Sequence, residues 1–353
     1  MDPNSGKRRL VNKLSREELL AKLEGEAFER KTLSFYKYVI IEDPKALRDE
    51  LFAQWREWDC LGRIYVSREG INAQMNVPAH HWDAFEQHLH GMEYFMDVPF
   101  KMAVTDNTDG RSFLKLIIKV RDQIVADGLQ PEDYDVTDVG AHLTAKDWND
   151  AIENHNPIIV DMRNHYESEI GHFEGAILPE AKTFREELPM VLDKLKGQEN
   201  RKILLYCTGG IRCEKTSAYL KHHGFSDVNQ LHGGIIDYAR QIDEEVLPNK
   251  FHGINFVFDE RLGERISDEI ISECHQCGQP SATHVNCANK ACNLLFIQCE
   301  ECAEKNEGCC TPQCIEIIHL PEEEQAEIRH TAKGTKRFHR HTKVDLRNAF
   351  SQQ

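Results

Sequence analysis

The stretch KILLYCTGGIRCEKTSAYL, residues 202–220, decides the fold of the middle of this chain. It opens with the apolar run ILLY, typical of a strand buried on both faces, and closes with a helical pattern. Between them lies a short loop that holds Cys207 and the pair Gly209 and Gly210. In an open α/β sheet, ligands bind just outside the carboxyl ends of the strands. The stretch therefore predicts an α/β domain with a site at Cys207.

The loop has the residue types that activate a thiol. Gly209 and Gly210 allow backbone N–H groups to turn inward around a small anion, and the following helix adds its positive end. Both effects lower the pKa of a cysteine and favour a reactive thiolate. We interpret Thr208, Gly209, Gly210 and Ile211 as an active-site loop. The alternative is an inert, buried cysteine in an ordinary strand-turn-helix unit.

The length of the loop narrows the choice of family. Four residues separate Cys207 from Arg212, whereas cysteine-dependent phosphatases place five before their arginine. The shorter loop resembles rhodanese, a sulfurtransferase that carries a persulfide on this cysteine. The upstream run VDMRNHYESEIGHFEGA, residues 160–176, also matches the rhodanese pattern. The positions that brace the domain in that family are Asp161, Arg163, Glu167 and His172. We take Cys207 and Arg212 as the catalytic residues.

A second cysteine follows at the start of the predicted helix. Cys213 is a candidate redox partner for Cys207, because a nearby thiol can resolve an oxidised one. A helix start is also a common place for a packed cysteine, and the sequence leaves both readings open.

Two further regions flank this domain, so a multidomain chain with α/β and α+β parts is expected. Strands alternate with helices over residues 145–247, which predicts a parallel sheet covered on both faces. Upstream, residues 31–128 contain two predicted helices among about five strands, an order that favours a ferredoxin-like, acylphosphatase-like domain. Its first strand, residues 33–41, precedes Asp43 as helix cap and Pro44 at the first helical position. Residues 1–30 are expected as a leader and 129–144 as a linker.

The C-terminal part is rich in cysteine. Nine of the twelve cysteines lie there: Cys274, Cys277, Cys287, Cys292, Cys299, Cys302, Cys309, Cys310 and Cys314. Two-residue gaps let two thiolates reach one tetrahedral ion, so eight sulfurs would fill two structural zinc sites with one left over. His275 and His284 are alternative ligands, and a redox or iron–sulfur centre is a further alternative. We expect a zinc module over residues 248–320 and a flexible tail, finally basic, over 321–353.

Charge bears on partners. The chain has 353 residues, 43 basic and 59 acidic, for a net charge of −16, which argues against a general polyanion binder. Basic residues nonetheless gather in two places, and the RNA-binding candidates are Lys115, Lys119, Arg121, Lys333, Lys336, Arg337 and Arg340. Tyr36 and Tyr38 are available to stack on bases, or else belong to the core. No apolar run approaches the ~20 residues of a membrane span, and no secretory signal opens the chain, so the cytoplasm is expected.

The motifs together resemble one family, the oxygen-dependent tRNA wobble-uridine hydroxylases. The runs that carry the resemblance are GRIYVSREGINAQMNVP, KVRDQIVADG, YCTGGIRCEK, HGGIIDYA, NFVFDERLGERISDEII and CHQCG. The resemblance implies that the chain forms 5-hydroxyuridine in the anticodon loop of tRNA, with molecular oxygen as co-substrate and Cys207 as the active cysteine. We find no flavin, haem or nicotinamide signature, which leaves the oxygen chemistry to the thiol. Two alternatives are a persulfide sulfurtransferase and a zinc-bearing RNA-binding scaffold without activity.

Overall fold

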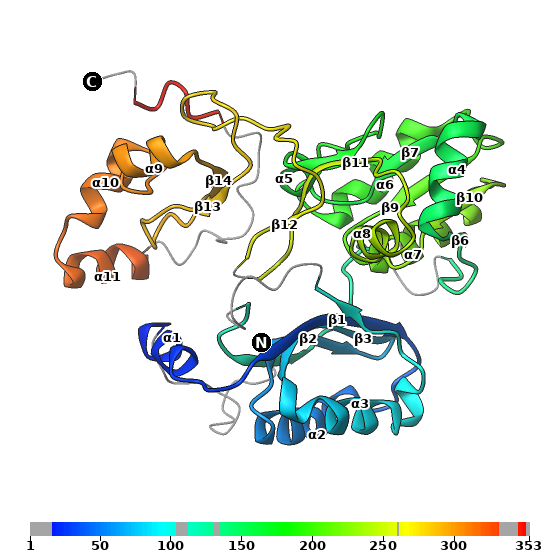
Figure 1. Ribbon diagram of the computed structural model, residues 1–353, viewed down its shortest axis with the longest axis horizontal. Helices are drawn as coiled ribbons and strands as arrows, with labels where there is room; N and C mark the ends of the chain where they lie inside the picture. Colours follow the sequence, from blue (N-terminus) through cyan, green and yellow to red (C-terminus); the bar gives the residue numbers. More distant parts are fainter. Residues whose placement is uncertain (1–15, 104–111, 130–133, 260, 332–344, 351–353) are drawn as a thin grey trace.

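The computed structural model describes residues 16–103, 112–129, 134–259, 261–331 and 345–350. Figure 1 shows a first domain with helices under a sheet, a second domain packed against the other face of that sheet, and a separate C-terminal module. This arrangement agrees with the predicted order of α+β, α/β and cysteine-rich parts.

The first domain is a sheet with helices on one face. Its elements are β1 (Arg30–Tyr38), α2 (Pro44–Glu57), β2 (Leu61–Ser67), β3 (Gly70–Pro78), α3 (Trp82–His90), β4 (Lys101–Met102) and β5 (Leu116–Val120). The strand order is β4-β1-β3-β2-β5; β2 pairs with β5 in parallel, and the other pairs are antiparallel. The predicted ferredoxin-like, acylphosphatase-like arrangement is confirmed, with β5 added at one edge.

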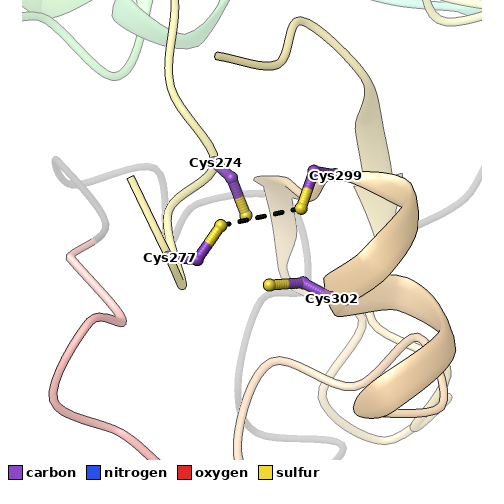
Figure 2. Close-up of side chains that lie close together, drawn as sticks. All are labelled: Cys274, Cys277, Cys299 and Cys302. Carbon is purple, nitrogen blue, oxygen red and sulfur yellow. Dashed lines mark hydrogen bonds between the residues drawn. The ribbon is translucent and has the colours of Figure 1, made fainter. Parts of the chain in front are cut away.

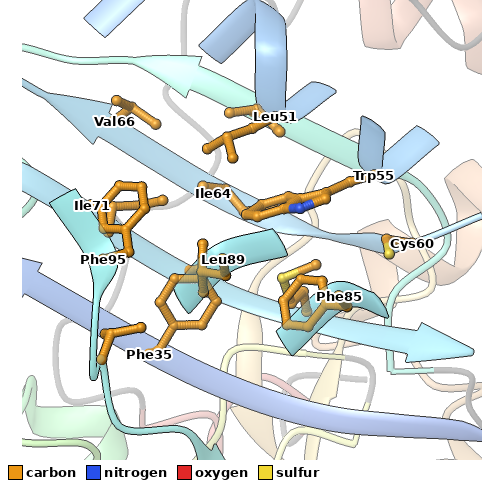
Figure 3. Packing of buried hydrophobic residues seen from close by; sticks show 14 of the residues in the cluster. Phe35, Leu51, Trp55, Cys60, Ile64, Val66, Ile71, Phe85, Leu89 and Phe95 are labelled. Carbon is orange, nitrogen blue, oxygen red and sulfur yellow. The ribbon is translucent and has the colours of Figure 1, made fainter. Parts of the chain in front are cut away.

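Local sequence explains where helix α2 begins. The Asp43 carboxylate accepts hydrogen bonds of 3.0 Å from the backbone N–H of Lys45 and of Ala46, and Pro44 occupies the first turn. Leu51 and Trp55 of this helix are fully buried, and Figure 3 shows them packed over Ile64, with Phe85 of α3 close to Trp55. The helices thus cover one sheet face and leave the other face open to the second domain.

The second domain is built around a parallel sheet of order β6-β10-β9-β7. These strands are β6 (Ala141–Leu143), β7 (Ile158–Asp161), β9 (Ile203–Tyr206) and β10 (Val228–Leu231). The helices α4 (Ala145–His155), α5 (His165–Ser168), α6 (Phe184–Leu195), α7 (Ile211–His222) and α8 (Gly234–Glu244) cover it. Every residue of β9 and β10 is buried, as expected for parallel strands covered on both faces.

Two boundaries differ from the prediction. β6 lies inside the expected linker, residues 129–144, and pairs with β10 of the second domain. The expected zinc module begins with β11 (Phe251–Asn255), which pairs with β8 (Gly171–Phe173) of the second domain, while β12 (Glu264–Arg265) pairs with β11. Short strands without alternating polarity give little signal, so their partners emerge only from the fold.

The C-terminal module holds β13 (His284–Asn286), β14 (Leu295–Ile297), α9 (Glu300–Lys305), α10 (Pro312–Ile318) and α11 (Glu322–Thr331). Helix α11 lies in the segment predicted as a tail, and α1 (Arg16–Glu24) lies in the segment predicted as a leader, so each segment contains a helix that was not predicted from the sequence. The helical residues Glu, Gln, Ala and Arg of α11 supply propensity where the apolar pattern is weak. Among the described residues, the helices lack the combination of length and apolar content that a membrane span requires.

Candidate active site and metal centres

Cys207 lies directly after β9 and is fully buried. Gly210 adopts a positive φ of 94° as the cap of α7, and its backbone N–H donates a 3.1 Å hydrogen bond to Cys207 Sγ. Although burial acts in the opposite direction, the Cys213 thiol, the Arg212 guanidinium and the loop amides lower the pKa of Cys207 to about 5. The loop therefore holds a thiolate at neutral pH, which is the nucleophilic form of cysteine.

Arg212 is held by a carboxylate on the other side of the loop. Its two terminal nitrogens donate to the two oxygens of Glu167 at 2.7 and 2.8 Å, in the paired geometry typical of arginine with carboxylate. Glu167 also accepts from the Asn164 backbone N–H and from the Thr208 hydroxyl. Arg212 thus fixes the loop to α5. Its guanidinium acts on Cys207 through its charge, and its backbone N–H donates a hydrogen bond to the sulfur.

Three other residues of the 160–176 run also brace the domain, as predicted. The fully buried Arg163 pairs with Asp161 at 2.7 Å and donates to the Gly171 carbonyl oxygen at 2.6 Å. The His172 ring contacts the Ser168 carbonyl oxygen at 2.8 Å. These groups fix the segment between β7 and β8 beneath the loop.

Two buried acids of different kind lie close to Cys207. Cys213 is fully buried in the first turn of α7, and its thiol is hydrogen-bonded to Cys207; burial and the Cys207 thiolate raise the pKa of Cys213 well above its usual value. Glu187 of α6 is also fully buried, and both its carboxyl oxygens lack a hydrogen-bond partner among the described residues. Burial raises the pKa of Glu187 well above its usual value, and the nearby Asp161, Glu167 and Cys207 act in the same direction, against the effect of Arg212.

The open face of the first sheet lies against the loop. Tyr36 of β1 donates a 3.0 Å hydrogen bond to Glu214 of α7, and Tyr38 donates to the Ile211 carbonyl oxygen at 3.4 Å. A Cβ on Gly210 would lie 2.9 Å from the Tyr36 hydroxyl, so only glycine admits this approach. Both tyrosines are half-buried between two domains, and neither presents a free ring to stack on a base.

Glu214 is the centre of a polar network at the rim of the site. His142 Nε2 lies 3.0 Å from one Glu214 oxygen, and the Gln230 amide donates to the other at 3.0 Å. Against the effect of burial, the hydrogen bonds from His142, Gln230 and Tyr36 hold the pKa of Glu214 below its usual range. The network joins β1, β6, β10 and α7 at one point.

A buried lysine clamps the first domain to the second. Lys215 of α7 is 1% exposed and pairs with Glu69 at 3.1 Å and with Asp127 at 2.8 Å. Glu69 belongs to the turn of the SREG run between β2 and β3, and it also accepts from the Ile124 backbone N–H at 2.7 Å. This turn therefore has a docking role in addition to closing a hairpin.

The cysteine-rich module forms two clusters of four sulfurs within the described residues. The first consists of Cys274, Cys277, Cys299 and Cys302, and the second of Cys287, Cys292, Cys310 and Cys314. In each cluster all ligand atoms lie within 4.8 Å of one another. Figure 2 shows the four sulfurs of the first cluster pointing toward a common centre. Both clusters are all-cysteine, so His275 and His284, considered as ligands, are not needed.

The sulfur spacing fits a single tetrahedral ion. Zinc bonds of about 2.3 Å to sulfur place the corners of a tetrahedron about 3.8 Å apart. Cys277 and Cys299 lie 3.6 Å apart, and Cys310 lies 3.7 Å from both Cys292 and Cys314. Cys309 is the cysteine left over, and it is fully buried beside the second cluster.

The RNA-binding candidates fall into two groups. Lys115 and Arg121 are exposed and Lys119 is half-exposed at the edge strand β5. Lys119 lies opposite Tyr65 in the register of β5 with β2, and the Arg121 guanidinium lies 5.5 Å from the centre of the Tyr65 ring. The other group, Lys333, Lys336, Arg337 and Arg340, lies outside the described residues.

Sequence reasoning missed the residues that meet at the site from different domains. Lys101 and Glu214 belong to this group, and no spacing rule links positions that lie so far apart in the chain. Glu187 had a usable signal: it occupies the apolar stripe formed by Phe184, Leu188 and Val191 on α6. A carboxylate on such a stripe indicates a buried acid.

Three family models match consecutive parts of the chain. They are described as the UPF0176 acylphosphatase like domain over residues 30–124, the rhodanese-like domain over 144–241 and the rhodanase C-terminal over 252–315. Their limits follow the three parts of the fold.

The chain is also similar to curated proteins over nearly its whole length. It is 56% identical to the tRNA uridine(34) hydroxylase of Leptospira interrogans, over 96% of this chain and 92% of that protein. It is 52% identical to the protein of the same name from Yersinia enterocolitica, over 90% of each. Among solved structures, a rhodanese-like domain from Anabaena covers 32% of this chain and 79% of its own, with 20% identity and a TM-score of 0.26.

Proposed function

The chain belongs to the tRNA uridine(34) hydroxylase family, and we propose that it hydroxylates the wobble uridine of tRNA with molecular oxygen, using Cys207. The observation that carries this proposal is the buried Cys207 thiolate, hydrogen-bonded by the Gly210 backbone N–H at the end of β9. A uracil ring is open to attack by a thiolate at C6, and this loop is built to supply one.

The proposed reaction starts with that attack. The Cys207 sulfur forms a bond to C6, the C5–C6 double bond opens, and the negative charge moves to the enolate formed by C5, C4 and O4. The electron-rich C5 then reacts with molecular oxygen to give a peroxide at C5. Two thiols then reduce the peroxide: the outer oxygen leaves as water and the thiols become a disulfide. Loss of the C5 proton expels the Cys207 thiolate and restores the C5–C6 double bond.

The electrons and atoms balance with two thiols per turnover. Uridine, dioxygen and two thiols give 5-hydroxyuridine, one water and one disulfide. Cys213 is placed to supply one of these thiols, because it is hydrogen-bonded to Cys207. The Cys213 thiol stays protonated at neutral pH. It therefore donates its hydrogen bond to the Cys207 thiolate until Cys207 forms its bond to C6.

Arg212 acts through the loop. Since both terminal nitrogens pair with Glu167, the backbone amides are better placed than Arg212 to donate to a developing anion. Arg212 contributes its positive charge, which helps to keep Cys207 ionised, and it fixes the loop to α5.

The tRNA is proposed to bind along basic surface at β5 and the C-terminal end of the chain. Lys115, Lys119 and Arg121 supply phosphate contacts at the edge of the first sheet. The target uracil, being in a loop, is free to unstack and turn toward Cys207. We place this reaction in the cytoplasm, in keeping with twelve unpaired cysteines.

Zinc is the proposed occupant of the two cysteine clusters. Four thiolates around one ion complete a closed tetrahedral site, which supplies folding energy and leaves no open position for catalysis. The two clusters lie in the C-terminal module, which contacts the end of α5. This contact joins His275 of the module to Glu169, and the two side chains lie 3.0 Å apart. Zinc would therefore stabilise the module that packs against the active domain.

The test is nucleoside mass spectrometry of tRNA lacking the wobble modification after incubation with the protein in air. A product heavier by one oxygen at the wobble uridine supports the proposal. Exchange of oxygen for sulfur would instead indicate a persulfide sulfurtransferase, and bound but unchanged tRNA would indicate a scaffold.

A further inference from the structure

Lys101 reaches the Cys207 loop from the first domain. It lies on β4, opposite Ser34 of β1. Its side chain runs over the loop, since a Cβ on Gly209 would lie 3.9 Å from Lys101 Cδ. The ammonium lies 3.9 Å from the centre of the Tyr36 ring, a distance at which the ring face attracts a cation.

The second domain surrounds this ammonium with negative groups. Cys207 follows β9, Glu214 belongs to α7 and Asp237 belongs to α8, and all three act electrostatically on Lys101. The Lys101 charge also acts on His142 of β6, where it opposes the rise in the pKa of that ring. Within the described residues, Lys101 forms no ion pair with a carboxylate, so its charge is available to a ligand.

The segment after β11 provides the remaining charged neighbours. Asp259, Arg261 and Glu264 line a cavity of about 30 Å³ together with Lys101 and Thr208. Arg261 pairs with both Asp259 and Glu264, which neutralises most of this charge. Among the described residues, Lys101 thus differs from Arg212 and Arg261 in having no ion pair with a carboxylate.

The size of the cavity shows what must move. A volume of about 30 Å³ holds about one water and is too small for a pyrimidine ring. Cys207 is fully buried, and Lys101 and Tyr36 lie over its loop. The flexible Lys101 side chain and Tyr36 therefore both belong to the cover over the loop, and this cover must shift before a base can reach the sulfur.

We propose that Lys101 is a catalytic residue of the hydroxylation, whose ammonium donates a hydrogen bond to O4 of the target uracil as Cys207 adds to C6. This inference rests on the proposed function. In the step, the carbon–sulfur bond forms, the C5–C6 double bond breaks, and the charge that leaves sulfur arrives on O4. The ammonium stabilises that oxygen anion, in a site where water is excluded.

The protonation of Lys101 gives the proposal a signature in pH. Burial lowers the pKa of Lys101 to about 8, although Cys207, Glu214 and Asp237 oppose the shift. Cys207 is already a thiolate well below that pH. The rate should therefore rise as Cys207 ionises, and fall as Lys101 loses its proton above about pH 8.

The experiment compares wild type with Lys101→Met, Lys101→Arg and the control Lys45→Met, an exposed lysine on α2. Single-turnover hydroxylation and tRNA affinity are measured from pH 6 to 10. Lys101→Met should lower the rate about 100-fold, the typical cost of removing one such donor, with the tRNA Kd changed less than about threefold. Lys101→Arg should retain much of the rate and lose the alkaline decline, because arginine stays charged.

The proposal is overturned if Lys101→Met reacts within threefold of wild type, or if Lys101→Arg still declines near pH 8. A second measurement tests the placement of Lys101 even if the protein does not hydroxylate tRNA. The pH midpoint for alkylation of Cys207 should rise in Lys101→Met, because a nearby cation is removed. A wild-type protein that makes no 5-hydroxyuridine refutes the proposed function, and an unchanged midpoint refutes the placement of Lys101.

Discussion

The Tyr36 hydroxyl donates a 3.0 Å hydrogen bond to the Glu214 carboxylate, across the boundary between two domains. Tyr36 lies on the open face of the first sheet, and Glu214 lies in the first turn after the Cys207 loop. Together with the Lys215 pairs to Glu69 and Asp127, this bond makes the first domain part of the active-site wall. The acylphosphatase-like domain is therefore placed to control access to the cysteine.

Removing the charge of Glu167 should destabilise the protein. Glu167→Gln leaves the buried Arg212 guanidinium without its carboxylate, a change that typically costs about 3 to 5 kcal/mol. Urea unfolding should show an earlier transition, and amide exchange should speed up in α5. The control is Lys196→Ala, which breaks an exposed pair with Asp193 and should change nothing measurable. Equal behaviour of the two variants would contradict the bracing role of Glu167.

The Cys207 thiolate should be visible in its alkylation by a small reagent such as iodoacetamide. With a pKa of about 5, the thiolate is nearly fully formed above pH 6, and labelling should fall as the pH drops through 5. Cys60 is the matched control, since burial raises its pKa to about 12 and it should stay unlabelled at neutral pH. Mass mapping of the labelled peptides distinguishes the two. A midpoint near the ordinary value for cysteine would contradict the loop electrostatics.

The cysteine clusters should bind two metal ions per chain. Cys292→Ser removes a ligand from the second cluster and should reduce the metal content from two ions to one. Cys309→Ser, one residue from the ligand Cys310, should retain both ions because Cys309 belongs to neither cluster. Elemental analysis of the purified variants measures this directly. Loss of metal from Cys309→Ser, or its retention in Cys292→Ser, would show that the ligands are assigned incorrectly.

The basic C-terminal residues should contribute to tRNA affinity through phosphate contacts. Replacement of Lys333, Lys336, Arg337 and Arg340 by glutamine should weaken tRNA binding. The slope of log K against log salt concentration should also become less steep, by the contribution of up to roughly four phosphate contacts. Filter binding at several salt concentrations checks both effects. An unchanged slope would assign these residues another role.

Much of the fold follows from the sequence because its signals are local. The buried run before Cys207 marks β9, Asp43 and Pro44 mark the start of α2, and cysteine spacing marks the C-terminal module. Spacing alone does not show which cysteines form each four-sulfur cluster. In the second cluster, Cys287 and Cys292 come together with Cys310 and Cys314, which lie much later in the sequence. Weak periodicity also concealed α11.

The active site was predicted only in part, for a physical reason. Cys207 and its loop are contiguous, so the sequence contains their chemistry. Tyr36 and Lys101 reach that loop only because one domain docks on the other. The residue pattern within a single strand does not predict such contacts between domains. The basic face on β5 was readable from alternation, but the tyrosines on the same sheet are engaged at the domain boundary instead of being free for bases.

In the proposed reaction, Cys207 directs the insertion of one oxygen atom from dioxygen into the wobble uridine. The most direct measurement incubates unmodified tRNA with wild type and Cys207→Ala under isotopically heavy dioxygen and weighs the digested nucleosides. We expect 5-hydroxyuridine carrying one heavy oxygen with wild type, and no product with Cys207→Ala despite normal tRNA binding. Product from Cys207→Ala, or product whose new oxygen comes from water, would contradict it.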